Sequence, residues 1–201
     1  MDANFFQHAR EFLPILLQGA VVTVEVTVLA FVLSSLLGLA LALMKLSPAR
    51  TLSWGASGVI NVIRGLPIIV QLFYIYFVLP DAGIHLTAFQ AGVIGLGIAY
   101  SAYQAENFRA GIEAVDPGQR EAAQAMGMYG NTLVMMLKDS SLVSTITVAE
   151  MTRAGQLIAS STFQNMTVYT LVALLYLLMS LPLVFGLRRL ERRLGAGRKK
   201  P

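Results

Sequence analysis

The sequence has no cysteine and only two histidines, and charged residues make up 13% of its 201 positions. The lack of cysteine excludes disulfides, thiolate ligands and thiol nucleophiles, and two histidines are too few for a nitrogen-rich metal site. Soluble domains carry roughly 25% charged residues. The shortage of charge therefore excludes an ordinary soluble globule.

Apolar residues are abundant instead: 56% of the chain is hydrophobic and its mean hydropathy is +0.65. A buried core still needs a polar shell, so these residues must face lipid or one another within a bilayer. Neither a repeat nor a low-complexity tract divides the chain. The composition predicts one all-helical integral membrane domain, residues 1–201.

Charged residues and turn-forming strings divide the apolar sequence into five stretches near the roughly 20 residues that a spanning helix needs. Pro14 marks a turn around residues 14–19, before the first span, and LPDAG at residues 79–83 separates the second from the third. The fourth stretch contains charged residues, so it is expected to line an interior. The predicted spans are residues 21–44, 59–78, 87–108, 132–153 and 168–187.

Basic residues indicate the orientation of these spans. Seven of the 15 Lys and Arg residues lie in the last 14 positions, and the connections after the first and third spans are also basic, whereas residues 80–86 and 160–167 contain none. The positive-inside rule then puts the N-terminus outside and the C-terminus in the cytoplasm, with the first helix retained. The terminal cluster is interpreted as a topology signal, so no nucleic-acid partner is expected.

The cytoplasmic connection between the third and fourth spans, residues 112–130, contains helix boundary signals. Asp116 is suited to N-cap a helix, Pro117 to its first position, and Gly127 to its end. Alanines give the helix one flat side, beside which Arg120 offers a polar contact. From the residues alone, this helix is either an ordinary helical turn of a loop or a docking site for another protein.

Glu121, Ala122 and Ala123, followed by Gly127, resemble the EAA loop of permease subunits of ATP-binding-cassette (ABC) importers. Three further segments resemble the polar amino-acid branch of that family, which includes histidine, glutamine, arginine and opine permeases. They are residues 64–73 (RGLPIIVQLF), residues 99–111 (AYSAYQAENFRAG), and residues 137–156, which begin LKDSSLV and end EMTRAGQ. Four segments in family order are a more specific signal than the EAA triplet alone.

The resemblance implies the five-helix type I importer fold in a bacterial inner membrane. It also implies three kinds of protein partner: a second permease copy or paralogue, ABC ATPase subunits, and a periplasmic solute-binding protein. ATP and Mg would be bound by the partner ATPase. The chain itself has no GxxxxGK[ST] phosphate loop and no nucleophile paired with a base, so we expect no cofactor and no catalytic residue in it. The residues mapped to ATPase coupling are Arg120, Glu121, Ala122, Ala123 and Gly127.

The chain departs from the family pattern after the EAA motif. The pattern places Leu-Pro where Asp139 and Ser140 stand here, and Gly130 already resembles the start of the fourth span. Roughly 20 residues are therefore missing between Tyr129 and Gly130. They would complete the cytoplasmic elbow that reaches the ATPase.

Ionisable groups inside spans are functional candidates, because a lone charge in hydrocarbon costs about 3 kcal/mol or more. Glu106 and Arg109 are spaced i,i+3 and are predicted to form a structural ion pair on one helical face. Glu150 and Arg153 have the same spacing, and either pair with each other or complement the ammonium and carboxylate of an amino-acid substrate.

Lys138 and Asp139 are neighbours and point to different faces, which favours gate or inter-subunit contacts. Nearby hydroxyls such as that of Ser141 either form a polar wall or bond back to the helix. The candidate substrate-pathway residues are Lys138, Asp139, Ser141, Glu150 and Arg153.

The sequence thus favours a permease subunit that moves polar amino acids or related compounds by alternating access, dependent on a binding protein and coupled to a separate ATPase. Three alternatives stay open: a coupling-defective permease, a secondary carrier or channel independent of an ATPase, and a membrane scaffold that transports nothing.

Overall fold

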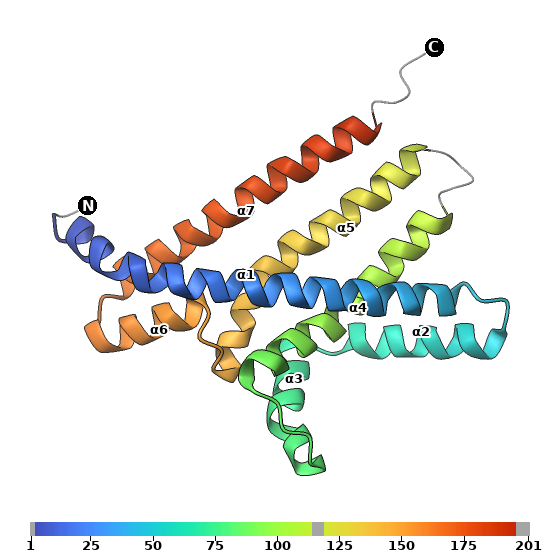
Figure 1. The fold of residues 1–201 in the computed structure, drawn as a ribbon, viewed down its shortest axis with the longest axis horizontal. Helices are drawn as coiled ribbons and strands as arrows, with labels where there is room; N and C mark the ends of the chain where they lie inside the picture. Colours follow the sequence, from blue (N-terminus) through green and yellow to red (C-terminus); the bar gives the residue numbers. More distant parts are fainter. Residues whose placement is uncertain (1–2, 114–118, 196–201) are drawn as a thin grey trace.

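The computed structural model describes residues 3–113 and 119–195, except for some side chains, among them those of residues 119–126. The described chain is helical with short connections, as the sequence predicted (Figure 1). The α-helices are α1 Ala3–Lys45, α2 Arg50–Gly65, α3 Ile68–Phe73, α4 Ala88–Glu113, α5 Gln119–Asp139, α6 Met151–Thr162 and α7 Asn165–Gly195. The π-helix η1 Tyr74–Val78 and the 3-10 helix η2 Leu79–Ala82 continue α3, and the 3-10 helix η3 Ser140–Ile146 continues α5.

Two of the described helices are long and apolar enough to cross a membrane, within Gln7–Lys45 of α1 and Asn165–Leu190 of α7. They contain the predicted first and fifth spans. The predicted turn around residues 14–19 is wrong, because α1 continues through Pro14. Proline inside a helix costs about 3 kcal/mol, and the burial of Phe12 and Leu16 against α6 and α7 offsets that cost.

The second and fourth predicted spans are each broken. The α2 axis and the α3 to η2 axis meet at 99°, and the helix pair Gly127–Ile146 and Met151–Thr162 meets at 51°. The described residues therefore provide up to four crossings by length and composition if each bent pair counts as one. Leu66-Pro67 interrupts the helix within the predicted span 59–78, and residues 147–150 interrupt it within the predicted span 132–153.

Helix α4, which contains the predicted third span, lies at the centre of the packing. Its eleven buried residues are mostly glycine and alanine, and Leu96 and Tyr100 join a core cluster with residues of α1, α3, α5 and η3. Gly38 of α1 lets the two helices approach closely, since a Cβ there would lie 2.9 Å from the Ser101 carbonyl oxygen. Other helices of the chain therefore surround much of α4.

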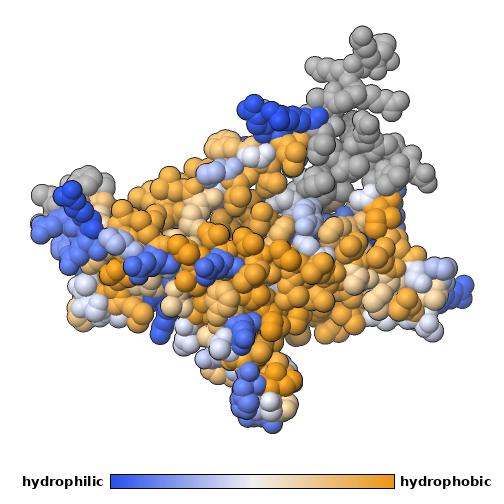
Figure 2. Space-filling view, in the orientation of Figure 1, coloured by the Kyte–Doolittle hydropathy of each residue, from blue (hydrophilic) through white to orange (hydrophobic). Residues whose placement is uncertain are grey.

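The connection from α1 to α2, the C-terminal ends of α4 and α7, and the start of α5 lie toward one end of the molecule (Figure 1). The N-terminus and α6 lie toward the other. Apolar residues cover the sides of the helices, and hydrophilic residues gather at their ends (Figure 2). Leu36 of α1 and Leu178 of α7 are 65% and 64% exposed on these sides. This distribution suits helices embedded in lipid.

Candidate functional site

The break between α2 and α3 leaves carbonyl groups that a single side chain satisfies. Helix α2 ends at Gly65, and Pro67 has no N–H to continue it. The buried Gln71 amide donates from Nε2 to the carbonyl oxygens of Ile63 at 2.9 Å and Leu66 at 3.0 Å. Gln71 thus stabilises the break from inside the fold, a role that the sequence analysis missed.

Glu150 forms the second break. Thr147 adopts a φ of 68° where η3 ends, and Glu150 then N-caps α6. Its carboxylate accepts hydrogen bonds from the backbone N–H groups of Thr152 at 2.9 Å and Arg153 at 2.8 Å. An N-cap contributes about 1 kcal/mol to helix stability. The carboxylate therefore fixes where α6 begins.

The same carboxylate, which is fully buried, connects three helices. The Tyr176 hydroxyl of α7 donates to it at 2.9 Å and the Thr23 hydroxyl of α1 at 3.3 Å. Gly19 brings α1 close enough for this contact, because a Cβ there would lie 2.8 Å from Cα of Met151. Glu150 thereby joins α1, α6 and α7.

One of the two alternatives for Glu150, an ion pair with the Arg153 side chain, is not formed. Among the described residues, every ion pair involves Glu106 or Arg109, and the Arg153 guanidinium instead donates to Oε1 of Gln156 at 3.3 Å. The i,i+3 rule applies to two residues within a helix. Glu150 precedes the first turn in an extended conformation, so its carboxylate meets the Arg153 backbone.

Lys138 and Asp139 point to different faces of α5, as their adjacency predicted. Lys138 is exposed, whereas Asp139 accepts a hydrogen bond from the buried Tyr100 hydroxyl of α4 at 2.6 Å. Ser141 is half-buried in η3, and its neighbour Ser140 donates to the Leu137 carbonyl at 2.7 Å. The Ser140 hydroxyl therefore bonds back to its own helix and does not add to a polar wall.

Glu106 and Arg109 form the predicted pair on α4, with a distance of 2.9 Å from Nε to Oε2. Lys45 at the end of α1 also contacts Glu106 at 2.5 Å, and Arg109 reaches Glu113 at 2.6 Å. The sequence analysis missed Lys45, whose contact joins two distant segments. This cluster ties α1 to α4 at the end that carries the basic connections.

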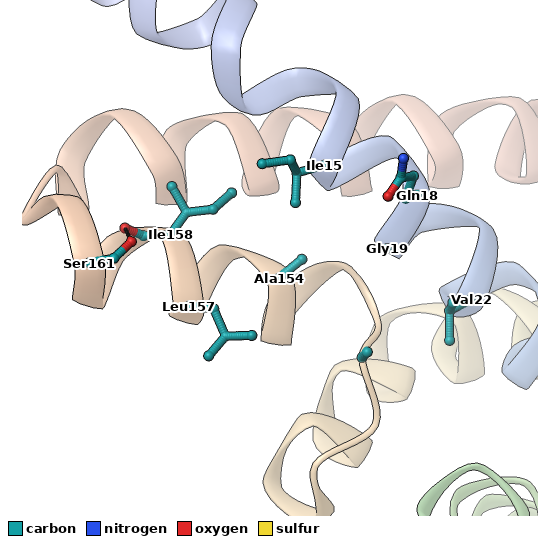
Figure 3. Close-up of a pocket in the computed structure, with 9 residues that line it drawn as sticks. Ile15, Gln18, Gly19, Val22, Ala154, Leu157, Ile158 and Ser161 are labelled. Atoms are coloured by element: carbon teal, nitrogen blue, oxygen red, sulfur yellow. Dashed lines mark hydrogen bonds between the residues drawn. The ribbon is translucent and has the colours of Figure 1, made fainter.

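An open cavity of about 530 Å³ lies between α1 and α6 (Figure 3). The residues that line it recur at i, i+3, i+4 and i+7 on each helix. They are Ile15, Gln18, Gly19 and Val22 of α1, Ala154, Leu157, Ile158 and Ser161 of α6, and Ala149 from the loop before α6. None of the candidate pathway charges lines this apolar cavity. Residues 3–113 and 119–195 also contain no cluster of three His, Asp or Glu side chains placed to hold a metal ion.

The segment predicted to couple to an ATPase, residues 120–127, is called the coupling motif, and it continues directly into the rest of α5. Arg120, Glu121, Ala122 and Ala123 lie in the first turns of α5, and their side chains are outside the described residues, as are Asp116 and Pro117 entirely. The expected helix end at Gly127 is wrong: α5 passes through it and lines a small cavity of about 190 Å³ against α7 there. The chain does not turn at Gly127, because the residues around it allow the helix to continue.

Comparison with known proteins agrees with this architecture. Residues 34–132 match the family described as binding-protein-dependent transport system inner membrane components. The chain is 36% identical to the probable amino-acid ABC transporter permease protein y4tG of Sinorhizobium fredii, over 86% of this chain and 84% of that one. It is also 36% identical to the glutamine transport system permease protein GlnP of Escherichia coli, over 90% and 94% of the two chains.

The chain belongs to the amino-acid ABC transporter permease family. Among solved structures, it resembles an amino acid ABC transporter crystallised with histidines, with 38% identity, a TM-score of 0.85, and coverage of 96% of this chain and 100% of that chain. The inward-facing methionine transporter MetNI shares the fold at 16% identity and a TM-score of 0.71, over 96% and 99% of the two chains. The relatives of this chain in the family are transport subunits and not enzymes.

One comparison bears on the size of the stretch predicted to be missing. The alignment with y4tG runs over 194 positions but includes 86% of the 201 residues here, so roughly 20 of its positions have no counterpart in this chain. That number agrees in size with the stretch absent between Tyr129 and Gly130.

Proposed function

We propose that the chain is the inner-membrane permease subunit of an ATP-driven importer for polar amino acids or related compounds, working by alternating access. The observation that supports this most is the match to an amino acid ABC transporter structure over 96% of the chain at 38% identity. Relatives named for glutamine, arginine and cystine transport support the substrate class.

In this proposal the chain supplies half of the pathway and a second permease copy or paralogue supplies the rest. ABC ATPase subunits bind ATP and Mg and contact the start of α5, and a periplasmic binding protein delivers the amino acid. The chain itself holds no cofactor. Its basic connections and C-terminus lie in the cytoplasm, as the positive-inside rule indicates.

The two helix breaks are the best candidates for the pathway wall. Non-helical backbone at membrane depth is tolerated only where protein covers it or where it lines a water-filled cavity. Asp139 and Arg153 flank the second break, and both are only partly buried in the single chain. Facing a second permease across this surface, they would offer charges that complement an amino acid's ammonium and carboxylate.

The shortened connection favours one second candidate, a permease that assembles but does not couple. Co-purification of the chain with the ATPase encoded beside it, followed by ATP hydrolysis in lipid with and without the neighbouring binding protein, distinguishes the two. We expect hydrolysis to rise with loaded binding protein, and Glu121→Ala to reduce that rise at least about tenfold.

Glu11→Ala, at an exposed position of α1 before the first predicted span, is the control and should behave like the wild type. A second variant carries a family-like segment of about 20 residues between Tyr129 and Gly130. If only this variant responds to the binding protein, the coupling-defective candidate is correct.

A further inference from the structure

Tyr129 lies where the coupling motif joins the membrane helix, and α5 is unbroken there. At about 1.5 Å per residue, the 18 steps from Glu121 to Asp139 extend roughly 27 Å along a single axis. One helix therefore connects the coupling motif to the Asp139 hydrogen bond with Tyr100. With no elbow between them, no flexible segment absorbs a displacement of the motif.

The Tyr129 side chain holds α5 against two other helices. Its hydroxyl lies 2.8 Å from the Ser35 hydroxyl of α1. Its ring packs edge-on against Phe31 of α1 at a centroid distance of 5.0 Å, and against Phe108 of α4 at 5.4 Å. Aromatic pairs at these separations contribute about 0.5–1.5 kcal/mol beyond their buried area.

Gly130 and Thr132 hold α5 from other directions. Gly130 is buried, and a Cβ at that position would clash with the Leu187 side chain of α7. The Thr132 hydroxyl accepts a hydrogen bond from the Asn107 amide of α4 at 3.0 Å. Within residues 129–132, α5 is thus in contact with α1, α4 and α7, and Figure 1 shows α5 and α7 running side by side from this region.

We propose that Tyr129 is the positioning residue about which α5 pivots, so that movement of the coupling motif reaches Asp139 and the second break through one rigid helix. The inference rests on the proposed function, since it needs an ATPase at the start of α5. Tyr129 is roughly 12 Å along the axis from Glu121 and roughly 15 Å from Asp139. The parts of α5 on either side of Tyr129, its two arms, are similar in length. Displacements of Glu121 and Asp139 about the pivot therefore have similar size and opposite direction.

Tyr129→Phe and Ser35→Ala test this pivot, because each removes the hydrogen bond between the two hydroxyls and keeps the ring contacts of residue 129. Ser35→Ala also removes the hydrogen bond that the Ser35 hydroxyl donates to the Phe31 carbonyl oxygen at 2.7 Å. The assay is the number of amino-acid molecules imported per ATP hydrolysed by the full chain with its ATPase and binding protein in lipid. Loss of one hydrogen bond predicts a ratio about two- to tenfold lower in both variants. The double variant should equal either single one. Tyr169→Phe, at an exposed tyrosine of α7, is the control.

A distance measurement separates pivoting from mere structural support. The chain has no native cysteine, so spin labels at Met135→Cys on α5 and Leu174→Cys on α7, both exposed, report the position of α5 relative to α7. We expect ATP to change this distance in the wild type and to change it less in Tyr129→Phe. A purely structural role would lower thermal stability without altering that change.

If the wild-type complex couples hydrolysis to import and both variants import as many molecules per ATP as the wild type, the pivot is overturned. So would loss of ATPase binding in both, which would make Tyr129 an assembly residue. A wild-type complex without binding-protein-stimulated hydrolysis contradicts the proposed function itself, and the pivot with it. Finally, inserting the family-like segment after Tyr129 should make the Tyr129→Phe substitution neutral, because an elbow then separates the two arms.

Discussion

Two buried polar side chains, Glu150 and Gln71, satisfy the backbone groups that the helix breaks leave open. In lipid an unsatisfied backbone group costs several kcal/mol. Each break is consequently stable only while its own side chain is present. If the breaks form the pathway wall, as we propose, these residues hold its shape and affect transport without touching a substrate.

Glu150→Ala removes the acceptor for two backbone N–H groups and for the hydroxyls of Tyr176 and Thr23. We expect it to lower the free energy of unfolding by about 1 to 3 kcal/mol, the usual cost of buried donors left unpaired. Glu150→Gln keeps one acceptor oxygen and should lose less. Thermal unfolding in detergent measures both, with the exposed Glu25→Gln as the control. Equal stability of all three variants would contradict the capping role.

Sequence reasoning succeeded at single residues where both partners lie inside one helix, as Glu106 and Arg109 do. It failed for Glu150 and Arg153 because their geometry depends on where α6 begins. The apolar content around Glu150 masked that boundary, although a carboxylate three residues before Arg153 is also a capping signal. Lys45 could not be assigned to Glu106, since nothing local specifies a contact between α1 and α4.

At the scale of helices, close approach between α1 and α4 depends on Gly38. An alanine Cβ there would lie 2.6 Å from Cβ of Gln104 and 2.9 Å from the Ser101 carbonyl oxygen, so the helices must separate. We expect Gly38→Ala to lower the free energy of unfolding by about 1–3 kcal/mol, as overpacking does.

Gly58→Ala on α2 is the matched control, because nothing lies within 4 Å of its Cβ position. Alanine is the better helix former by about 1 kcal/mol, so this variant should be slightly more stable than the wild type. Chemical unfolding curves in detergent give both values. If Gly38→Ala and Gly58→Ala changed the free energy of unfolding in the same direction, the close packing of α1 on α4 would be contradicted.

Hydropathy located the first and fifth spans well because α1 and α7 expose long apolar sides. It could not separate a straight helix from two short ones, since both bury the same apolar residues. Pro67 was a visible signal for the first break. The second break depends on Thr147 at positive φ and on the contact of Glu150 with α1, neither of which a window average detects.

At the scale of the whole molecule, the connection from α1 to α2 and the C-terminal ends of α4 and α7 lie toward one end, as the distribution of basic residues predicts. The orientation of that end in the membrane can be tested directly. Single cysteines at Pro48, between α1 and α2, and at His85, before α4, are both exposed. We expect a membrane-impermeant maleimide to label His85→Cys in intact spheroplasts and Pro48→Cys only after permeabilisation. The reverse pattern would place the C-terminus outside and exclude cytoplasmic coupling.

Uptake of an amino acid shows whether this chain is one half of an ATP-driven importer despite its short connection. The measurement is accumulation of a radiolabelled polar amino acid in proteoliposomes that hold the wild-type chain with its ATPase, with binding protein and ATP on the appropriate faces. We expect accumulation against a gradient that requires both ATP and binding protein. Uptake by the chain alone under an ion gradient, or no uptake under either driving force, would contradict it.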